Sequence, residues 1–298
     1  MYKSMIKVYN IISWNENIVN YNLRLELQKP NDFNFFDITS NINEADVICI
    51  QDNISSNYMN AFNNRNLNSK VFLFEREPSY LNLFNSNLKS HADKIITYDK
   101  NICFVRWWLN YSYNELTNLK YNDLTKDKEY VCVTSNKHKT HGQKTRYDWL
   151  LKHQNDFNID FYGKPKLKDL FKNYKGLPES YCNKEGINRT QDKSILGQYH
   201  KSFSFENGQQ KNFITRVNED LLMWTLPLYW GCSNIDEIYP KNSYRYIDIE
   251  KPLSKELIEI INEPVSKDEM IAIEEARLLV LNKYNWWVYV KEIIEQNF

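Results

Sequence analysis

Two carboxylates stand close together where an apolar segment of the chain ends. Residues 70–74 are typical of a strand, and Glu75 and Glu77 follow it just before Pro78. Side chains two positions apart on a strand share a face, so these two can work as a pair in proton transfer. Like-charge coupling would then raise the pKa of one of them. The alternative, two solvated loop carboxylates, stays open.

A permanently charged side chain stands near the start of a later helix. The sequence Val-Thr-Ser-Asn-Lys at residues 133–137 ends a strand, and Lys144, Thr145 and Arg146 open the next helix. The N–H groups and the positive dipole end of a helix start attract anions, and Arg146 adds a planar cationic fork. This arrangement suits a diphosphate. The alternative is a surface arginine that pairs with Asp148 or another nearby carboxylate.

A third polar group follows a strand at residues 205–208, Phe-Glu-Asn-Gly. A carboxylate at the carboxyl end of a parallel strand can accept hydrogen bonds from the hydroxyl groups of a ribose or a sugar, which is the role we expect for Glu206. Asn207 tolerates the backbone angles of a tight turn. The alternative is a strand-ending turn with a solvated glutamate.

These residues can act together only in a fold that brings the ends of several strands to one place. Apolar strands alternate with helical segments in both halves of the chain, which predicts an α/β protein with parallel sheets covered on both faces. The polar residues 111–130 are expected to connect two domains. Strands are expected at 6–12, 45–51, 70–74, 94–98, 130–134, 158–162, 202–205, 226–230 and 244–249. Helices are expected at 18–27, 58–63, 81–91, 144–153, 215–223 and 255–262, a helix or turn at 167–174, and a last helix from 266 onward, interrupted near Asn285.

The composition narrows the class of protein. The 298 residues carry 38 basic and 38 acidic side chains, and this balance argues against a duplex-DNA binder. The five cysteines show no CxxC spacing, and three of them lie in apolar runs, as expected of reduced thiols in a cytosolic protein. No apolar run reaches about 18 residues, so we expect neither a membrane span nor a standard secretion signal. The sequence has no HExxH and no clear DxD metal motif.

Residues 202–240 resemble the donor-binding core of the α-1,3-fucosyltransferases, glycosyltransferase family 10. The Phe-Glu-Asn turn at 205–207 and the strand Pro-Leu-Tyr-Trp-Gly at 227–231 carry the likeness, which extends with gaps over 133–249. The resemblance implies a GT-B fold, in which two Rossmann-like α/β domains face a cleft. The N-terminal domain, 1–125, would bind the acceptor. The C-terminal domain, 126–298, would bind the nucleotide sugar, and its last helix would cross back onto the N-terminal domain.

The resemblance also implies roles for individual residues. Glu77 or Glu75 would be the catalytic base. The donor would be bound by Ser135, Asn136, Arg146, Glu206, Asn207, Phe213, Thr215 and Arg216. The chain departs from the family where a Glu-Lys pair is replaced by Arg216 and Val217; a one-residue shift would instead place Arg216 on the lysine position. Glu219 and Asp220, one helical turn on, are possible substitutes for the missing acid.

An inverting glycosyltransferase is therefore the expected function, moving a sugar onto a hydroxyl of a glycan or glycoconjugate. By resemblance the sugar is fucose and the donor is GDP-fucose. Two alternatives remain: a different nucleotide sugar, or a non-catalytic nucleotide- or carbohydrate-binding protein of the same fold. We expect no metal, no nucleic-acid partner and a cytoplasmic protein of bacterial or viral origin. Trp286 and Trp287 leave open a peripheral membrane or dimer contact beside the expected packing between domains.

Overall fold

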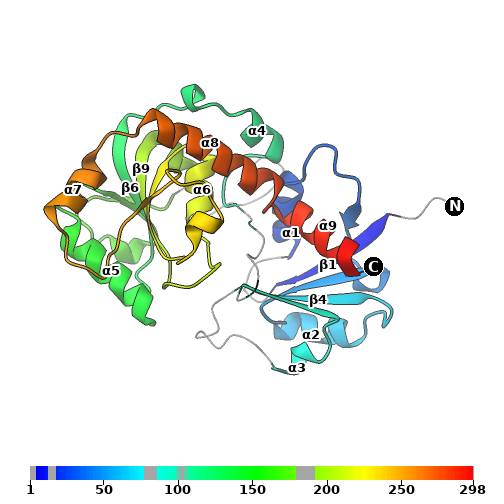
Figure 1. The fold of residues 1–298 in the computed structure, drawn as a ribbon. Helices are drawn as coiled ribbons and strands as arrows, with labels where there is room; N and C mark the ends of the chain where they lie inside the picture. Colours follow the sequence, from blue (N-terminus) through cyan, green and yellow to red (C-terminus); the bar gives the residue numbers. More distant parts are fainter. Residues whose placement is uncertain are drawn as a thin grey trace. The chain divides into compact units, whose positions relative to one another are not determined.

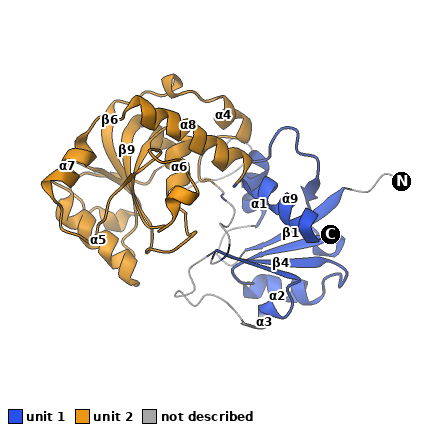
Figure 2. Ribbon diagram, in the orientation of Figure 1, with its two compact units in different colours: residues 1–106, 284–298 blue, residues 107–283 orange. Residues whose placement is uncertain are grey.

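The chain divides into two compact units, each described here by itself. The computed structural model describes residues 5–12, 18–76, 86–98, 100, 105, 107–178 and 192–297. Unit 1 contains Met1–Arg106 and Tyr284–Phe298, and unit 2 contains Trp107–Lys283 (Figure 2). The division differs from the expected one at residue 125. Residues 107–125 belong to unit 2 because they pack there: Arg277 donates to Leu116 O at 2.8 Å, and Trp224 Nε1 donates to Leu119 O at 3.1 Å.

Unit 1 is a parallel sheet between helices (Figure 1). Its described strands follow the order β2-β1-β3-β4-β5, and every neighbouring pair is parallel. The strands are β1 (Ile6–Ile12), β2 (Phe36–Ile38), β3 (Val47–Gln51), β4 (Lys70–Glu75) and β5 (Lys94–Thr97). The helices are α1 (Ile18–Leu27), α2 (Ser56–Asn63), α3 (Ser86–Lys89) and α9 (Trp286–Asn297).

Alternation along the strands of unit 1 builds two cores. Val8 and Ile12 face α1 and α9, whereas Tyr9 and Ile11 face α2. The last helix thus belongs to the first unit, and the break predicted near Asn285 is confirmed because α9 starts at Trp286. Trp286 and Trp287 are both 0% exposed within this core, and Trp287 stacks on Phe36 at 4.9 Å. The two rings therefore present no surface to a membrane or to a second copy.

Unit 2 is a second parallel sheet. Its described strands follow the order β11-β10-β9-β6-β7-β8. The strands are β6 (Lys128–Val133), β7 (Asp160–Tyr162), β8 (Tyr174–Gly176), β9 (Tyr199–Phe205), β10 (Leu226–Trp230) and β11 (Arg245–Tyr246). The helices are α4 (Tyr113–Asn118), α5 (His141–His153), α6 (Val217–Leu222), α7 (Lys255–Asn262) and α8 (Lys267–Asn282).

An aromatic core joins α5 and α7 to one face of the unit 2 sheet. Phe203 and Phe205 of β9 pack with Trp149 of α5, and the same cluster includes Ile261 of α7. On β9, Ser202 and Ser204 alternate with these rings, and the Ser204 hydroxyl donates to Asp220 of α6. Helix α6 also packs on β10 and against α8. The α/β prediction with covered parallel sheets is confirmed in both units.

Candidate functional site at the strand ends of unit 2

The carboxyl ends of two neighbouring strands bring the predicted site residues together. Strands β6 and β9 are parallel, so the segments that leave them, 134–140 and 206–216, start from the same edge of the sheet. Thr140 Oγ1 accepts from Gln143 N at 3.3 Å and caps α5. The same hydroxyl lies 3.4 Å from Asn207 O, so the start of α5 touches the turn after β9. Ser135 and Asn136 lie, half-buried, on the segment that leads into α5.

Gly142 permits this close approach. A Cβ atom at this position would lie 2.4 Å from both Asn207 O and Gly208 Cα, which are backbone atoms that cannot swing aside. The sequence did not single out Gly142, because only the packing of α5 against the turn reveals its role.

Substituting Gly142 by alanine should therefore push the start of α5 away from the turn. We expect a loss of about 1–3 kcal/mol in the free energy of unfolding, the usual cost of overpacking. Gly197→Ala is the matched control, since its nearest contact at 2.7 Å is the flexible end of the Met223 side chain. Denaturant unfolding of both variants measures the difference, and equal stability would contradict the proposed contact.

Arg146 is the central cation of the site. Its side chain is 1% exposed, and Nη1 donates to Phe205 O and Asn207 Oδ1, both at 3.1 Å. Among the described residues, Nε and Nη2 have no hydrogen-bond partner. Burial, aided by the charge of Arg216, lowers the pKa of Arg146 to about 9. A buried cation with unsatisfied N–H groups is a strong site for an anion, and at 1% exposure Arg146 is not the surface arginine of the alternative interpretation.

Arg216 adds a second guanidinium at the same edge. It occupies the N-cap position of α6, and its Nη1 donates to Val133 O, the last residue of β6, at 3.0 Å. The next residue, Val217, is 1% exposed and packs in the core. The cation of this segment therefore stands at 216, and position 217 offers only apolar packing.

Glu206 holds the start of α6. Its carboxylate is 0% exposed; Oε1 accepts from Thr215 N at 2.6 Å and Arg216 N at 2.9 Å, and Oε2 accepts from the Thr215 hydroxyl at 2.5 Å. Burial raises the pKa of Glu206, and the hydrogen bonds from Thr215 oppose that rise. Gly231 leaves room for this side chain, because a Cβ there would lie 2.4 Å from Glu206 Cγ. Both oxygens are thus engaged with the protein, and ligand contact by Glu206 stays a prediction.

The loop that carries Thr215 is fastened to the segment after β10. Asn212, with φ 60°, donates its N–H to Asn234 Oδ1 at 2.8 Å, and Asn234 Nδ2 returns a bond to Asn212 Oδ1 at 2.9 Å. Phe213, within this loop, is 2% exposed. Sequence reasoning missed the Asn212–Asn234 pair; the only signal was an asparagine beside each of two glycine-containing turns.

Glu219 and Asp220, the possible substitutes for the missing acid, point into the protein and are not placed as ligand-binding acids. Glu219 is 1% exposed; it pairs with Lys193 at 3.0 Å and accepts from Trp108 N at 3.1 Å. Asp220 is 2% exposed and accepts from the Ser204 hydroxyl. Burial raises the pKa of Asp220 to about 7. Within the described residues, these two carboxylates therefore serve the packing of α6.

The raised pKa of Asp220 predicts a pH-dependent stability. Between pH about 4 and 7 the folded state holds a proton on this carboxyl that the unfolded chain releases, so its contribution to stability falls as pH rises. Asp220→Asn removes that titration. The free energy of unfolding of wild type minus that of Asp220→Asn should fall by more than about 1 kcal/mol from pH 5 to pH 8, as measured by denaturant unfolding. A difference that stays constant with pH would contradict the assignment.

The candidate bases belong to unit 1. Glu75 is the last residue of β4; it is 6% exposed, and its Oε1 lies 2.6 Å from Lys89 Nζ. The alternative of a solvated carboxylate therefore does not apply to Glu75. Glu77 lies outside the described residues, so its role and the pairing of the two carboxylates stay predictions.

Comparison with protein families finds a match for the segment that contains these site residues. The family model described as glycosyltransferase family 10 (fucosyltransferase), C-terminal, matches residues 124–271. That range contains β6, α5, the turn after β9 and α6. The chain is a glycosyltransferase of family 10. No curated protein matches the sequence of this family 10 enzyme.

Solved structures agree with the fold of the family 10 enzyme. An α1,3-fucosyltransferase with GDP is 17% identical, with a TM-score of 0.52 over 99% of this chain and 90% of that one. An α-glucosyltransferase in complex with UDP and DNA is 12% identical, with a TM-score of 0.52 over 99% of this chain and 100% of that one. A glycosyltransferase from Rickettsia africae ESF-5 is 14% identical, with a TM-score of 0.50 over 99% and 98%. The two parallel α/β units and these neighbours identify the GT-B architecture.

Among the residues that the structure describes, no three His, Cys, Asp or Glu side chains gather as metal ligands would. None of the enzyme's described helices has the length and apolar character needed to cross a bilayer.

Proposed function

We propose that the enzyme transfers a sugar from a GDP-linked donor, by family fucose, to a hydroxyl of a glycan acceptor with inversion at the anomeric carbon. The buried Arg146 guanidinium carries the proposal. It is held on one side by Phe205 O and Asn207 Oδ1, while Nε and Nη2 have no described partner. A diphosphate would supply the missing acceptors and the compensating negative charge.

The residues around Arg146 would have separate roles in binding the donor. Arg216, which lowers the pKa of Arg146 through its own charge, would share the leaving diphosphate. Glu206 would act by fixing Thr215 and Arg216 at the start of α6. Ser135 and Asn136 lie on the segment that leaves β6, and Phe213 is buried in the loop before Thr215, so we assign them to the wall of the donor pocket.

The acceptor would be activated by Glu75 or Glu77. The carboxylate takes the proton of the acceptor hydroxyl, whose oxygen attacks the anomeric carbon as the bond to the diphosphate oxygen breaks. The diphosphate leaves with that electron pair. In this proposal unit 1 binds the acceptor and unit 2 binds the donor.

The donor sugar has one alternative that a specific observation favours. The family has an acid and a lysine where this chain has Arg216 and the buried Val217. The acids one turn further along, Glu219 and Asp220, are engaged inside the protein. A nucleotide sugar other than GDP-fucose is therefore the second candidate.

Turnover with a panel of donors tests the proposal. GDP-fucose, GDP-mannose, UDP-glucose and UDP-galactose would each be incubated with the enzyme and mixed glycans, and nucleotide release would be measured. We expect release with one GDP-sugar, loss of release in Arg146→Ala, and retention in EDTA, since two arginines supply the positive charge. Nucleotide binding without turnover of any donor would instead favour a non-catalytic binding protein. We place the enzyme in the cytoplasm of a bacterial or virus-infected cell.

A further inference from the structure

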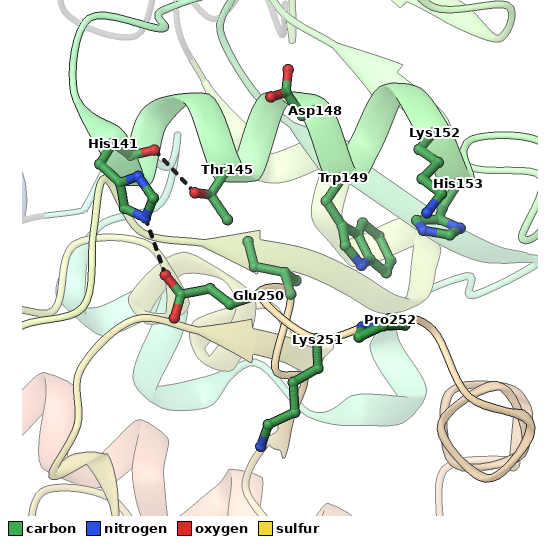
Figure 3. Close-up of a pocket in the computed structure, with 10 residues that line it drawn as sticks. His141, Thr145, Asp148, Trp149, Lys152, His153, Glu250, Lys251 and Pro252 are labelled. Atoms are coloured by element: carbon green, nitrogen blue, oxygen red, sulfur yellow. Dashed lines mark hydrogen bonds and ion pairs between the residues drawn. The ribbon is translucent and has the colours of Figure 1, made fainter.

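A groove in unit 2 lies outside the donor site. It runs between α5 and residues 249–252, which follow β11, and encloses about 620 Å³ (Figure 3). This volume falls within the usual range of ligand pockets, about 300–1,000 Å³. The donor residues described above, Arg146 and Glu206 among them, are not part of its lining.

The charges that line the groove balance one another. Lys152 and Lys251 carry positive charge, and Asp148 and Glu250 carry negative charge. Lys251 is already paired with Asp248 at 2.9 Å. A phosphate or a nucleotide would meet two carboxylates, and a cation would meet two amines. A neutral ligand with many hydroxyl groups can use both kinds, since each hydroxyl donates and accepts.

An apolar strip lies beside these polar groups. Trp149, Ile249 and Pro252 line the groove, and Figure 3 shows the Trp149 indole reaching from α5 toward Lys251 and Pro252. The indole is fixed by an edge-on contact with Phe205 at 5.2 Å. Its Nε1–H is buried and, within the described part of the chain, has no acceptor. A buried donor without a partner costs free energy that the oxygen of a bound ligand would recover.

One end of the groove is closed by a contact between its two walls. His141 Nε2 of α5 lies 3.4 Å from Glu250 Oε1, as Figure 3 shows. The next residue, Gly142, packs against the backbone of Asn207 in the donor turn. The groove therefore begins beside the donor turn and extends away from it along α5.

We propose that this groove binds a neutral oligosaccharide. The inference rests on the proposed function, because the saccharide would be a portion of the glycan acceptor or product remote from the reacting hydroxyl. The mixed donors and acceptors would bind the hydroxyl groups, and the exposed Pro252 would contact the apolar face of a sugar ring above a floor formed by Trp149 and Ile249, each 5% exposed.

Indole N–H signals of the full-length ¹⁵N-labelled protein report directly on the groove. The signal of Trp149 is assigned by its loss in Trp149→Phe. Lactose and maltotriose are then titrated in the presence of saturating GDP, so that the donor site is filled. We expect a saturable shift of the Trp149 signal with at least one saccharide, and about fivefold or greater weakening in Glu250→Ala. Glu259→Ala, an exposed glutamate on α7 outside the groove lining, is the matched control and should bind as wild type does.

Three results would overturn the inference. They are a Trp149 signal that stays fixed with both saccharides, a shift by GDP that displaces the saccharide, and an equally strong shift by inorganic phosphate. The first denies saccharide binding, the second assigns the groove to the donor site, and the third makes it an anion site. Arg146→Ala separates this inference from the proposed function, because it should abolish transfer and leave the saccharide-induced shift intact. Lys152→Ala, an exposed change, replaces Glu250→Ala should the latter fail to fold.

Discussion

Arg146→Ala should lose binding of GDP by about a hundredfold or more and abolish transfer. The guanidinium is buried, is charged at neutral pH, and has Nε and Nη2 directed to no described acceptor. Removing one partner from a buried charge pair costs about 3–5 kcal/mol, which is roughly two to four orders of magnitude in affinity. Isothermal titration with GDP measures the loss, and nucleotide release from the donor sugar measures the activity.

The same substitution should leave the ligand-free protein folded. Keeping a cation buried beside Arg216 costs free energy, as the lowered pKa of Arg146 shows. The unfolding free energy of the apo variant should therefore fall less than the cavity alone would suggest, or even rise. Arg146→Lys keeps a charge without the planar fork and should bind GDP with intermediate affinity. Affinity for GDP within threefold of wild type in Arg146→Ala would remove the diphosphate assignment.

The sequence was sufficient to predict which polar residues of unit 2 would gather at one edge of its sheet. Apolar strands followed by polar turns placed Arg146, Glu206 and Thr215 at one sheet edge, because parallel neighbours end on the same side. The structure brings these residues into contact through Asn207 and Arg216. Apolar residues repeat every two positions in a strand and about every 3.6 positions in a helix, depending only on which face of the element is buried. This periodicity is therefore enough to locate the elements and their ends from the sequence.

The roles of the carboxylates could not be read in this way. The sequence favours a ligand contact for Glu206 and offers Asp220 as a substitute acid, but partners distant in the chain decide the environment of both carboxylates. Glu206 reaches Thr215 because Gly231 leaves space for it, and Asp220 is covered by the packing of α6 on Ser204. The predicted domain boundary at residue 125 differs from the observed one for the same reason. Residues 107–125 are polar, but Arg277 and Trp224 of unit 2 donate hydrogen bonds to Leu116 O and Leu119 O.

Glu77→Gln or Glu75→Gln should reduce transfer by about 10²–10⁴-fold while leaving GDP affinity unchanged. A glutamine keeps the shape of the side chain but cannot take the proton of the acceptor hydroxyl, and general-base catalysis is worth about this factor. The proposed donor residues Arg146 and Arg216 bond to Phe205, Asn207 and Val133, which belong to unit 2 as they do, so we expect these bonds to persist in both variants. Steady-state kinetics with the active donor, combined with GDP titration, separate the two effects.

The structure makes the two variants unequal. Glu75 is buried against Lys89 at 2.6 Å, so Glu75→Gln also breaks an ion pair and should lower the thermal midpoint. Lys89→Ala is the control, because it breaks the same pair and keeps the carboxylate. If Glu75 is the base, Glu75→Gln is inactive and Lys89→Ala retains transfer. If Glu75 is structural, Glu75→Gln and Lys89→Ala are equally destabilised and both retain transfer. In that second case Glu77→Gln alone is inactive. Transfer that survives in both glutamine variants would show that the base lies elsewhere in the chain.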